Sequence, residues 1–335
     1  MPAKISTKDL SCWILVDAGK KGSENQAIGL AERLDWPFTL HRLDLPCLSS
    51  RKQRGAYVHK LEHSSPYPNI IISSGRRSQP IATTFKKRHP EVFLIALLNP
   101  LMPLSLFDLV IAPQHDRLRG PNVLSLRGVW HRVTREKLQE GVRQESFPQL
   151  RRPLLGVLLG GTSKHYNWTH TSAISLMAHC PPFLPPQPPR FRVLYETLLS
   201  FDKKGWGVVI LPSRRTPSWL VRDLQRQTAD TSILIDKGTG PVNPYLSVLA
   251  AADALLVTAD SMSMISEACA TGKPVYIFPL AGASRKLSAL QQSFCDAGYA
   301  RPFQGVIDFW TPPPLEEREI EEKIAERVMR FLSRH

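Results

Sequence analysis

The stretch DALLVTADSMSMISEACATGKPVYIFPL, from Asp253 to Leu280, decides the fold. DALLVTAD and PVYIFPL are apolar runs that predict buried strands, and SMISEACATG between them predicts a helix. A strand, a helix and a second strand in series are typical of a parallel sheet that is covered on both faces. Ligands of such sheets bind beyond the carboxyl ends of the strands. The residues that directly follow each strand are therefore the candidates for function.

The same alternation of strand and helix extends over most of the chain. Apolar runs predict strands from CWILV, at Cys12, to NVLSLRG. A polar connector from His131 to Pro153 follows, and the pattern then restarts with LLGVLLGG at Leu154. We therefore expect an α/β protein with two Rossmann-like, doubly wound domains, over residues 1–145 and 150–310.

Two segments stand outside this alternation. Residues 180–190 contain six prolines, so they predict a surface excursion rather than a helix or strand. Residues 311–335 predict a C-terminal helix that begins after three prolines. Its apolar face, spaced at helical turns, consists of Ile320, Ile324, Val328 and Phe331. We expect this face to dock on the body of the protein.

The composition favours a partner that carries negative charge. Of 335 residues, 42% are hydrophobic, enough to build cores, and the formal net charge is +14. Residues 1–150 carry 22 Lys and Arg against 13 Asp and Glu, so the first half holds +9 of the excess. Such charge suits phosphorylated small molecules or an anionic membrane surface. Nucleic acid is not expected as a partner, because RNP-like motifs, paired zinc ligands and basic tails are missing from the sequence.

The cysteines and the amino-terminal segment predict the cellular compartment of the protein. Five cysteines are scattered without a CxxC pair, which indicates free thiols in a reducing environment: Cys12, Cys47, Cys180, Cys269 and Cys295. The sequence begins without the apolar core of a signal peptide, and it holds no run of about 20 apolar residues. We expect a cytoplasmic protein, peripheral to the inner membrane.

In the first half, three loops that follow predicted strands carry polar residues. DAGKKGSENQ holds Gly19 and Gly22, which allow a tight turn, and we expect Ser23 to cap the next helix in a capping box with Gln26. ISSGRRSQP makes a compact cationic corner, and IAPQHD places His115 after the fifth strand. A lone histidine is more often a hydrogen-bonded surface residue than a base.

In the second half, the corresponding loops are richer. GGTSKHYNW offers paired glycines, hydroxyls and a lysine, and LPSRRTP offers two arginines, whose planar forks bind phosphate oxygens well. In TADSMSM, Ser261 and Ser263 stand where a helix begins, and the helix dipole favours negative charge there. Glycines, hydroxyls and cations at one edge of a sheet are the set that a diphosphate–ribose ligand needs.

These motifs resemble those of a known family. DAGKKGSENQAIGLA, SSGRRSQPIA, GGTSKHYNW, LPSRRTP and TADSMSMISEACATGKPVY follow the order found in the "elongated mitochondria" family, known from plant mitochondrial fission and from bacterial proteins of undefined activity. The likeness covers nearly the whole chain except the proline-rich segment. The family in turn resembles GT-B glycosyltransferases and epimerases, which have two facing Rossmann-like domains with an interdomain cleft. In that fold the C-terminal domain holds the nucleotide sugar.

The resemblance implies roles for individual residues. By it, Glu267 grips the ribose, and the donor and its phosphates are held by Gly160, Gly161, Thr162, Ser163, Lys164, Arg214, Arg215, Ser261, Ser263 and Glu267. The acceptor-side loop of the first domain comprises Gly19, Gly22, Ser23, Asn25, Gln26, Gly75 and Arg76. Glu24 is the expected general base, with Asp17 and His115 behind it. Arg214 or Lys164 would neutralise the leaving diphosphate, so a metal is not expected.

The expected function is that of a metal-independent glycosyltransferase. It would use a nucleoside-diphosphate sugar as substrate, need no cofactor, and act on an anionic or lipid-linked acceptor. One alternative is a nucleoside-diphosphate-sugar 2-epimerase, which shares the fold but needs acid and base residues around the sugar. A second is a non-catalytic adaptor of GT-B fold, linked to membrane or organelle fission. The oligomeric state is left open.

Overall fold

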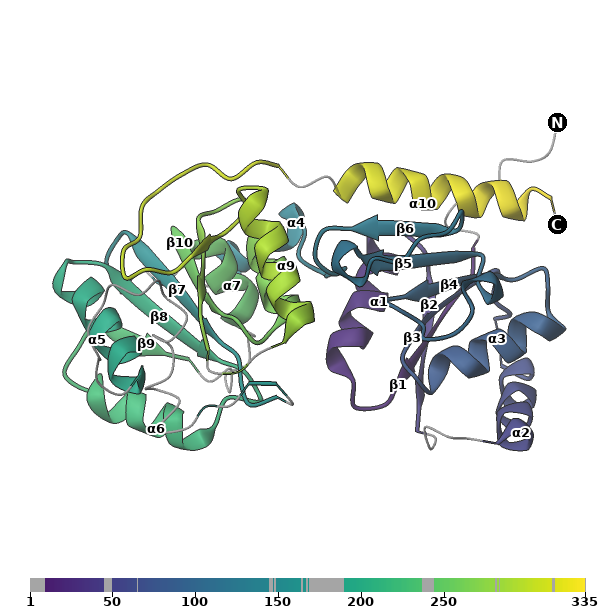
Figure 1. Ribbon diagram of the computed structural model, residues 1–335, viewed down its shortest axis with the longest axis horizontal. Coiled ribbons are helices and arrows are strands. Elements are labelled where there is room, and N and C mark those ends of the chain that lie inside the picture. The colour runs from purple at the N-terminus through teal and green to yellow at the C-terminus, as the bar shows by residue number, and fades with distance from the viewer. Residues whose placement is uncertain are drawn as a thin grey trace. The chain divides into compact units, whose positions relative to one another are not determined.

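The computed structural model (Figure 1) shows two units, each built on its own sheet. The residues that it describes are 10–44, 50–64, 66–144, 147, 149–163, 165–166, 168, 190–236, 244–280, 282, 284–314 and 317–334. The proline-rich segment 180–190 lies outside them except for Arg190, and so does Lys164. One unit comprises Met1–Arg132 and Leu315–His335, and the other comprises Val133–Pro314.

The first unit contains a six-stranded sheet in the order β2-β1-β3-β4-β5-β6, in which every pair is parallel. Its strands are β1 Cys12–Asp17, β2 Phe38–Leu43, β3 Ile70–Ser74, β4 Phe93–Leu97, β5 Leu109–Pro113 and β6 Val123–Leu126. The chain starts in the middle of the sheet, adds β2 on one side and continues from β3 on the other. The strand order therefore reverses between β1 and β3, which is where doubly wound sheets bind ligands.

Helices cover both faces of this sheet, as the apolar strands predicted. They are α1 Lys21–Arg33, α2 Arg51–Glu62, α3 Ser78–Arg88 and α10 Glu317–Leu332, with short 3-10 turns η2 Leu104–Leu106 and η3 Gln114–Asp116. Along β1, Ile14 and Val16 point into the core beneath α1 and α10, whereas Trp13 and Leu15 point into the core beneath α2 and α3. This alternation follows from the two-residue period of a strand.

The predicted C-terminal docking helix is α10. Ile324 and Val328 are fully buried on the sheet of the first unit, and the ring of Phe331 lies 5.1 Å from that of Phe93. At its amino-terminal end, Glu321 accepts a hydrogen bond from Arg33 of α1 at 2.8 Å. The apolar face that helical spacing predicted is therefore the face that α10 buries.

The second unit contains a six-stranded parallel sheet in the order β12-β11-β10-β7-β8-β9. Its strands are β7 Leu154–Leu159, β8 Gly207–Pro212, β9 Ile233–Ile235, β10 Ala254–Thr258, β11 Val275–Phe278 and β12 Arg301–Pro302. Its helices are α4 Arg135–Gln144, α5 Arg190–Lys203, α6 Ser218–Gln227, α7 Pro244–Ala251, α8 Met262–Cys269 and α9 Arg285–Asp296. The stretch from Asp253 to Leu280 forms β10, α8 and β11 as predicted. The strand order of this sheet reverses between β7 and β10.

The boundaries of the two units differ from the predicted domain boundaries. The prediction assigned residues 133–145 to the first domain and set 311–335 apart, whereas α4 belongs to the second unit and α10 to the first. Helix α4 packs closely on α7, because Gly141 brings its backbone against Leu246, where a Cβ would lie 2.8 Å from the carbonyl oxygen. Helical periodicity shows which face is apolar, but it does not name the sheet that the face covers. In the described part of the chain, no helix is long and apolar enough to cross a membrane.

We predict that Ile324→Ala lowers the free energy of unfolding by about 2–4 kcal/mol, because it opens a cavity beneath α10. The adjacent Lys323→Ala should change it by less than about 0.5 kcal/mol, because that side chain is half exposed. Urea denaturation of both variants measures the difference. Equal losses in the two variants would contradict the docking of α10 through its apolar face.

Candidate functional site

Asp260 stands at the centre of the second unit's carboxyl edge, directly after β10. Its side chain is buried, and its carboxylate accepts hydrogen bonds from the Gly161 N–H at 2.9 Å and the Thr258 hydroxyl at 2.7 Å. The Gly160 N–H in turn donates to the Thr258 hydroxyl oxygen at 2.7 Å. These bonds tie the loop after β7 to the end of β10, at the point where the strand order reverses.

The two glycines of this loop are required by close approach. A Cβ on Gly160 would lie 2.0 Å from a carboxylate oxygen of Asp260, and one on Gly161 would lie 2.0 Å from the backbone of Arg215. Side chains at these positions would push the loops after β7, β8 and β10 apart. The expected glycine pair is therefore a packing requirement as well as a source of backbone N–H groups.

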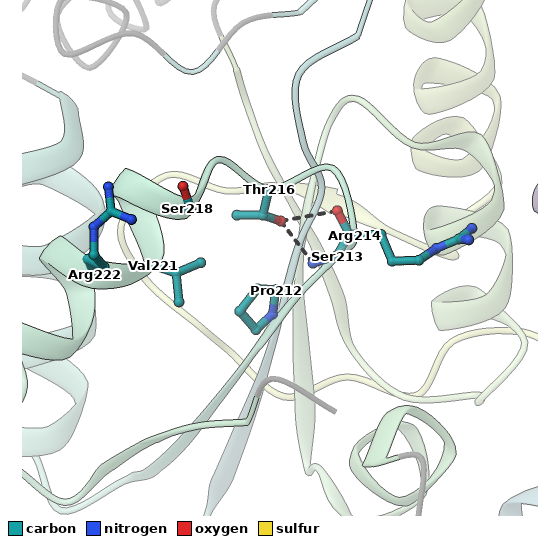
Figure 2. Close-up of a pocket in the computed structure, with 7 residues that line it drawn as sticks. All are labelled: Pro212, Ser213, Arg214, Thr216, Ser218, Val221 and Arg222. Carbon is teal, nitrogen blue, oxygen red and sulfur yellow. Dashed lines mark hydrogen bonds between the residues drawn. The ribbon is translucent and has the colours of Figure 1, made fainter. Parts of the chain in front are cut away.

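The loop after β8 is held against the same edge by Thr216. Its hydroxyl lies 2.7 Å from the Gly160 carbonyl oxygen and 3.0 Å from the Ser213 hydroxyl, and the Thr162 N–H donates to the Arg215 carbonyl at 3.1 Å. Figure 2 shows the Ser213 and Thr216 side chains together and the Arg214 side chain extending away from α6. A hollow of about 460 Å³ adjoins this loop, lined by Pro212, Ser213, Arg214, Thr216, Ser218, Val221 and Arg222.

An exposed arginine lies beside the buried carboxylate. The guanidinium of Arg215 is 3.9 Å from Asp260, and its side chain is 54% exposed. Burial raises the pKa of the Asp260 carboxyl, while its bonds to Thr258 and Gly161 oppose that rise. Arg215 therefore presents donors to solvent at an edge that also offers the partly exposed Ser163. Such a set can bind a phosphate oxygen.

Helix α8 begins at the same edge, as the sequence predicted. Ser261 is its N-cap, and the Ser261 hydroxyl accepts a hydrogen bond from the Met264 N–H at 3.4 Å. Ser263 stands in the first turn and is partly exposed. First-turn N–H groups have no acceptor within the helix, so this end of α8 favours an anion.

Glu267 lies on the second turn of α8 and is held from outside the helix. The Tyr245 hydroxyl, on α7, donates to its Oε2 at 2.5 Å. Burial, and next the charge of Glu267, raise the pKa of Tyr245 well above its ordinary value, so the phenol keeps its proton. This bond orients the Glu267 carboxylate, and the Glu267 side chain is partly exposed.

The structure thus brings most of the predicted donor residues to one edge of one sheet. Sequence reasoning did not select Asp260, Thr216 or Tyr245 as site residues. Asp260 carried a signal in the sequence, since it follows an apolar run that predicts a buried strand. Tyr245 carried none, because its contact with Glu267 depends on how α7 packs beside α8.

In the first unit, Asp17 also lies where the strand order reverses, but it ends β1, the first strand of its sheet, whereas Asp260 follows the strand across the reversal. It is buried, and its carboxylate accepts hydrogen bonds from the N–H groups of Ser78 at 2.9 Å and Arg77 at 3.1 Å, where α3 begins. Gly75 has a φ of +135°, and a Cβ there would lie 2.3 Å from Asp17. The contacts of Asp17 are those of a helix cap. Arg76, which follows Gly75, is exposed.

The expected cap of α1 is wrong. The helix begins at Lys21 after the N-cap Lys20, without a side-chain cap, so Ser23 lies inside the first turn. The tight turn at Gly19 (φ +77°) lets the Lys20 N–H bond to the Asp17 carbonyl at 3.2 Å, and this starts the helix before the serine. Within α1, Gly22 and Asn25 are exposed.

Glu24 is anchored by two cations. Arg42 of β2 donates to both of its carboxylate oxygens, at 2.8 and 3.0 Å, and Lys21 donates at 2.7 Å. The Glu24 side chain is only 5% exposed, and the bonds from Arg42 are the main reason why its pKa falls to about 2. A carboxylate that binds protons so weakly is a poor general base near neutral pH. These contacts favour an anchoring role for Glu24.

Two further residues of the first unit are placed at its carboxyl edge. The imidazole of His115, in η3 after β5, is 2% exposed and lies 3.8 Å from the Asp116 carboxylate. Gln26 is buried on α1, and its side-chain oxygen has no hydrogen-bond partner among the described residues.

The fold and the site can be compared with known proteins. A family model described as mitochondrial fission ELM1 matches residues 21–187 and 186–332. The mitochondrial fission protein ELM1 of Arabidopsis thaliana is 29% identical over 296 residues, or 79% of this chain, and the chain spans 64% of that relative's length. The uncharacterized protein RP120 of Rickettsia prowazekii is 25% identical over 320 residues, which cover 80% of this chain and 83% of the relative.

A solved structure shows the likeness in fold. The crystal structure of UDP-GlcNAc 2-epimerase from Neisseria meningitidis, bound to UDP-GlcNAc, matches with a TM-score of 0.50 at 11% identity. The match covers 96% of this chain and 94% of that chain. It supports the predicted GT-B-like pair of Rossmann-like domains, and at this identity it speaks for the fold alone.

We predict that Gly160→Ala destabilises the second unit by about 2–4 kcal/mol, because its Cβ has no room beside Asp260. Gly55→Ala is the control. It lies within α2, and the nearest atom to its Cβ would be the Arg88 guanidinium at 3.6 Å, so it should stabilise by about 0.5–1 kcal/mol. Thermal melting of the two variants should give shifts of opposite sign; a tolerated Gly160→Ala would contradict the close packing at Asp260.

We predict that Glu24→Gln flattens the acid limb of the stability profile. The folded pKa of Glu24 is lowered to about 2 from 4.5, so its ion pairs stabilise above pH 4.5 and this contribution is lost as the pH falls toward 2. The variant should lose about 1–2 kcal/mol at pH 7, a value reduced because Arg42 and Lys21 are half exposed. Urea denaturation from pH 7 to pH 3 checks this, and parallel profiles for the two proteins would exclude it.

Proposed function

The chain belongs to the mitochondrial fission ELM1 family, and from that premise we propose that it is a nucleotide-sugar enzyme of GT-B-like fold. The proposed reaction is metal-independent glycosyl transfer from a nucleoside-diphosphate sugar to an anionic or lipid-linked acceptor, in the cytoplasm at the inner membrane. The acceptor oxygen bonds to the anomeric carbon as the bond from that carbon to the diphosphate breaks. The nucleoside diphosphate leaves, and the hydroxyl proton passes to a base.

One observation carries this proposal. The loops after β7, β8 and β10 are joined by Asp260, Thr216 and the glycine pair, and together they present an exposed arginine and the start of α8. In this proposal Arg215, Arg214 and Lys164 neutralise the charge of the diphosphate. These cations have the role that a metal ion has in other transferases. Gly161 and Thr162 line the same edge.

The ribose is assigned to Glu267. A ribose diol offers two O–H donors, and a carboxylate that is oriented by the Tyr245 hydroxyl can accept them. Ser261 and Ser263 at the start of α8 would lie near the phosphates, where the dipole favours negative charge.

The base is assigned to His115 in place of Glu24. Glu24 has a pKa of about 2, so it is a poor base near neutral pH, and the Asp17 carboxylate is engaged by the N–H groups that begin α3. Histidine is the side chain most often used as a general base. Gln26, Asn25 and Arg76 are proposed to contact the acceptor, together with the turn at Gly19 and Gly75.

Two other functions remain candidates. The 2-epimerase reaction is favoured by the likeness in fold to the Neisseria enzyme, and it would use the same nucleotide site. An adaptor role is favoured by the name of the family, and it would need no nucleotide. Product analysis separates transfer from epimerisation, and nucleotide binding separates both from an adaptor.

We predict that one nucleotide family stabilises the protein in the presence of EDTA. At about 100 times its dissociation constant, a ligand adds about 2.7 kcal/mol, which raises the melting temperature by a few degrees. The screen uses UDP, GDP, CMP, ADP and their sugars. Glu267→Ala and Arg215→Gln should each weaken binding at least about tenfold, because each removes a charged hydrogen-bonding group.

Arg226→Gln is the matched control, because it removes an exposed cation on α6 away from this edge. Its binding should equal that of the unaltered protein. If no nucleotide stabilises the protein, the adaptor function replaces the transferase. If Arg226→Gln weakens nucleotide binding as much as Arg215→Gln does, the overall positive charge attracts the nucleotide and no specific site binds it.

A further inference from the structure

Helices α2 and α3 hold an unusual share of the positive charge. Their 23 residues carry seven Lys and Arg and one Glu, a net of +6 out of +14 for the whole chain. Both helices cover the same face of the first unit's sheet, with Val58 and Phe85 in the core beneath them. They lie side by side (Figure 1), and the Arg88 guanidinium of α3 lies next to Gly55 of α2. We call their outer surface the α2–α3 face.

Most of this charge is not used inside the protein. Lys86 pairs with Asp108, and Arg88 pairs with Glu62. The exposed cations of the face that form no ion pair with any described residue are Arg51, Lys52, Lys60 and Lys87. Lys52 and Lys60 of α2 and the exposed C-cap residue His63 recur at near-helical spacing, so they share one side of the helix.

Helix stability explains only two of these four positions. Lys60 and Lys87 stand in the last turns of their helices, where the helix dipole favours cations. Arg51 and Lys52 stand in the first turn of α2, where the helix dipole disfavours cations and where the helix has no acidic residue. The capping box of Ser50 and Gln53 holds this end together despite the charges. Arg51 and Lys52 weaken the start of their own helix and form no ion pair with a described residue, so a partner outside the chain explains them.

The side chains exposed on the α2–α3 face indicate what kind of partner it binds. Of the residues exposed between the cations, Ala56 offers no hydrogen-bonding group to a base, and the Gln53 side chain is engaged by the Ser50 N–H in the capping box. Beside the carboxyl end of α3, the 41% exposed Tyr67 packs on Phe85 and His89. A tyrosine with an apolar body and a polar tip is typical of the membrane–water interface.

We propose that the α2–α3 face docks this protein on an anionic lipid bilayer. Basic residues are drawn to such a surface by its negative potential, and an area formed by two packed helices can bring several of them to it at once. The docking does not depend on nucleotide binding, since its residues belong to a different unit from Arg215 and Glu267.

The test is co-sedimentation of the full chain with vesicles. Phosphatidylcholine vesicles are compared with vesicles that contain about 30% phosphatidylglycerol, at about 0.05 M and 0.3 M salt. We expect binding to the anionic vesicles only, and much less of it at high salt. Lys52→Glu/Lys60→Glu/Lys87→Glu should lower the affinity on the order of 100-fold.

The control variant is Lys203→Glu/Lys204→Glu/Arg226→Glu, which makes the same change in net charge at exposed positions of the second unit. It should lose less than about threefold, because none of these three positions belongs to the α2–α3 face. The milder Lys52→Gln/Lys60→Gln/Lys87→Gln should show an intermediate loss and serves if the reversed variant does not fold. Nucleotide-dependent melting shifts of all variants should equal that of the unaltered protein.

Three results would overturn the proposal. One is equal losses in the face variant and its control, which would mean that net charge alone drives binding. Another is unchanged vesicle binding in a folded face variant. The third is a DNA duplex that displaces the protein from the anionic vesicles at equal phosphate concentration, because the face would then belong to a nucleic-acid partner.

Discussion

Each unit depends on a buried carboxylate at the place where its strand order reverses. Asp17 is pressed against Gly75 and bonds to the N–H groups that begin α3, and Asp260 is pressed against Gly160 and bonds to the N–H of Gly161. Loops diverge at these places and leave N–H groups that no strand can satisfy. The carboxylate satisfies them, and the missing Cβ of the glycine allows it to come close. The positions of the surrounding polar groups follow from this contact.

The two edges nevertheless differ in what they offer a ligand. In the first unit the carboxylates are engaged: Asp17 caps a helix, and Glu24 is held by Arg42 and Lys21. In the second unit an arginine and the start of α8 are exposed beside a carboxylate that is buried. The carboxyl edge of the second unit's sheet is therefore better suited to bind an anionic ligand. This supports the assignment of the nucleotide to that edge.

Much of this arrangement could be predicted from the sequence. Apolar runs revealed the strands, and parallel strands bring the loops after them to one edge, so Ser261 and Glu267 could be placed. Contacts between distant segments could not be predicted. Arg42 turns Glu24 from a base into an anchored anion, Tyr245 reaches Glu267 from another helix, and a turn at Gly19 starts α1 before Ser23. The spacing of residues along the chain does not reveal contacts between residues that are far apart in the sequence.

The return of α10 to the first unit has a consequence for synthesis on the ribosome. The whole second unit, Val133–Pro314, is encoded between two parts of the first. It can therefore fold while the core around Ile14 and Val16 still lacks the Ile324 and Val328 side chains that cover it. Domains usually fold in the order in which they emerge. Here the first unit emerges first from the ribosome but completes its core last. The apolar face of its sheet needs protection until α10 has been made.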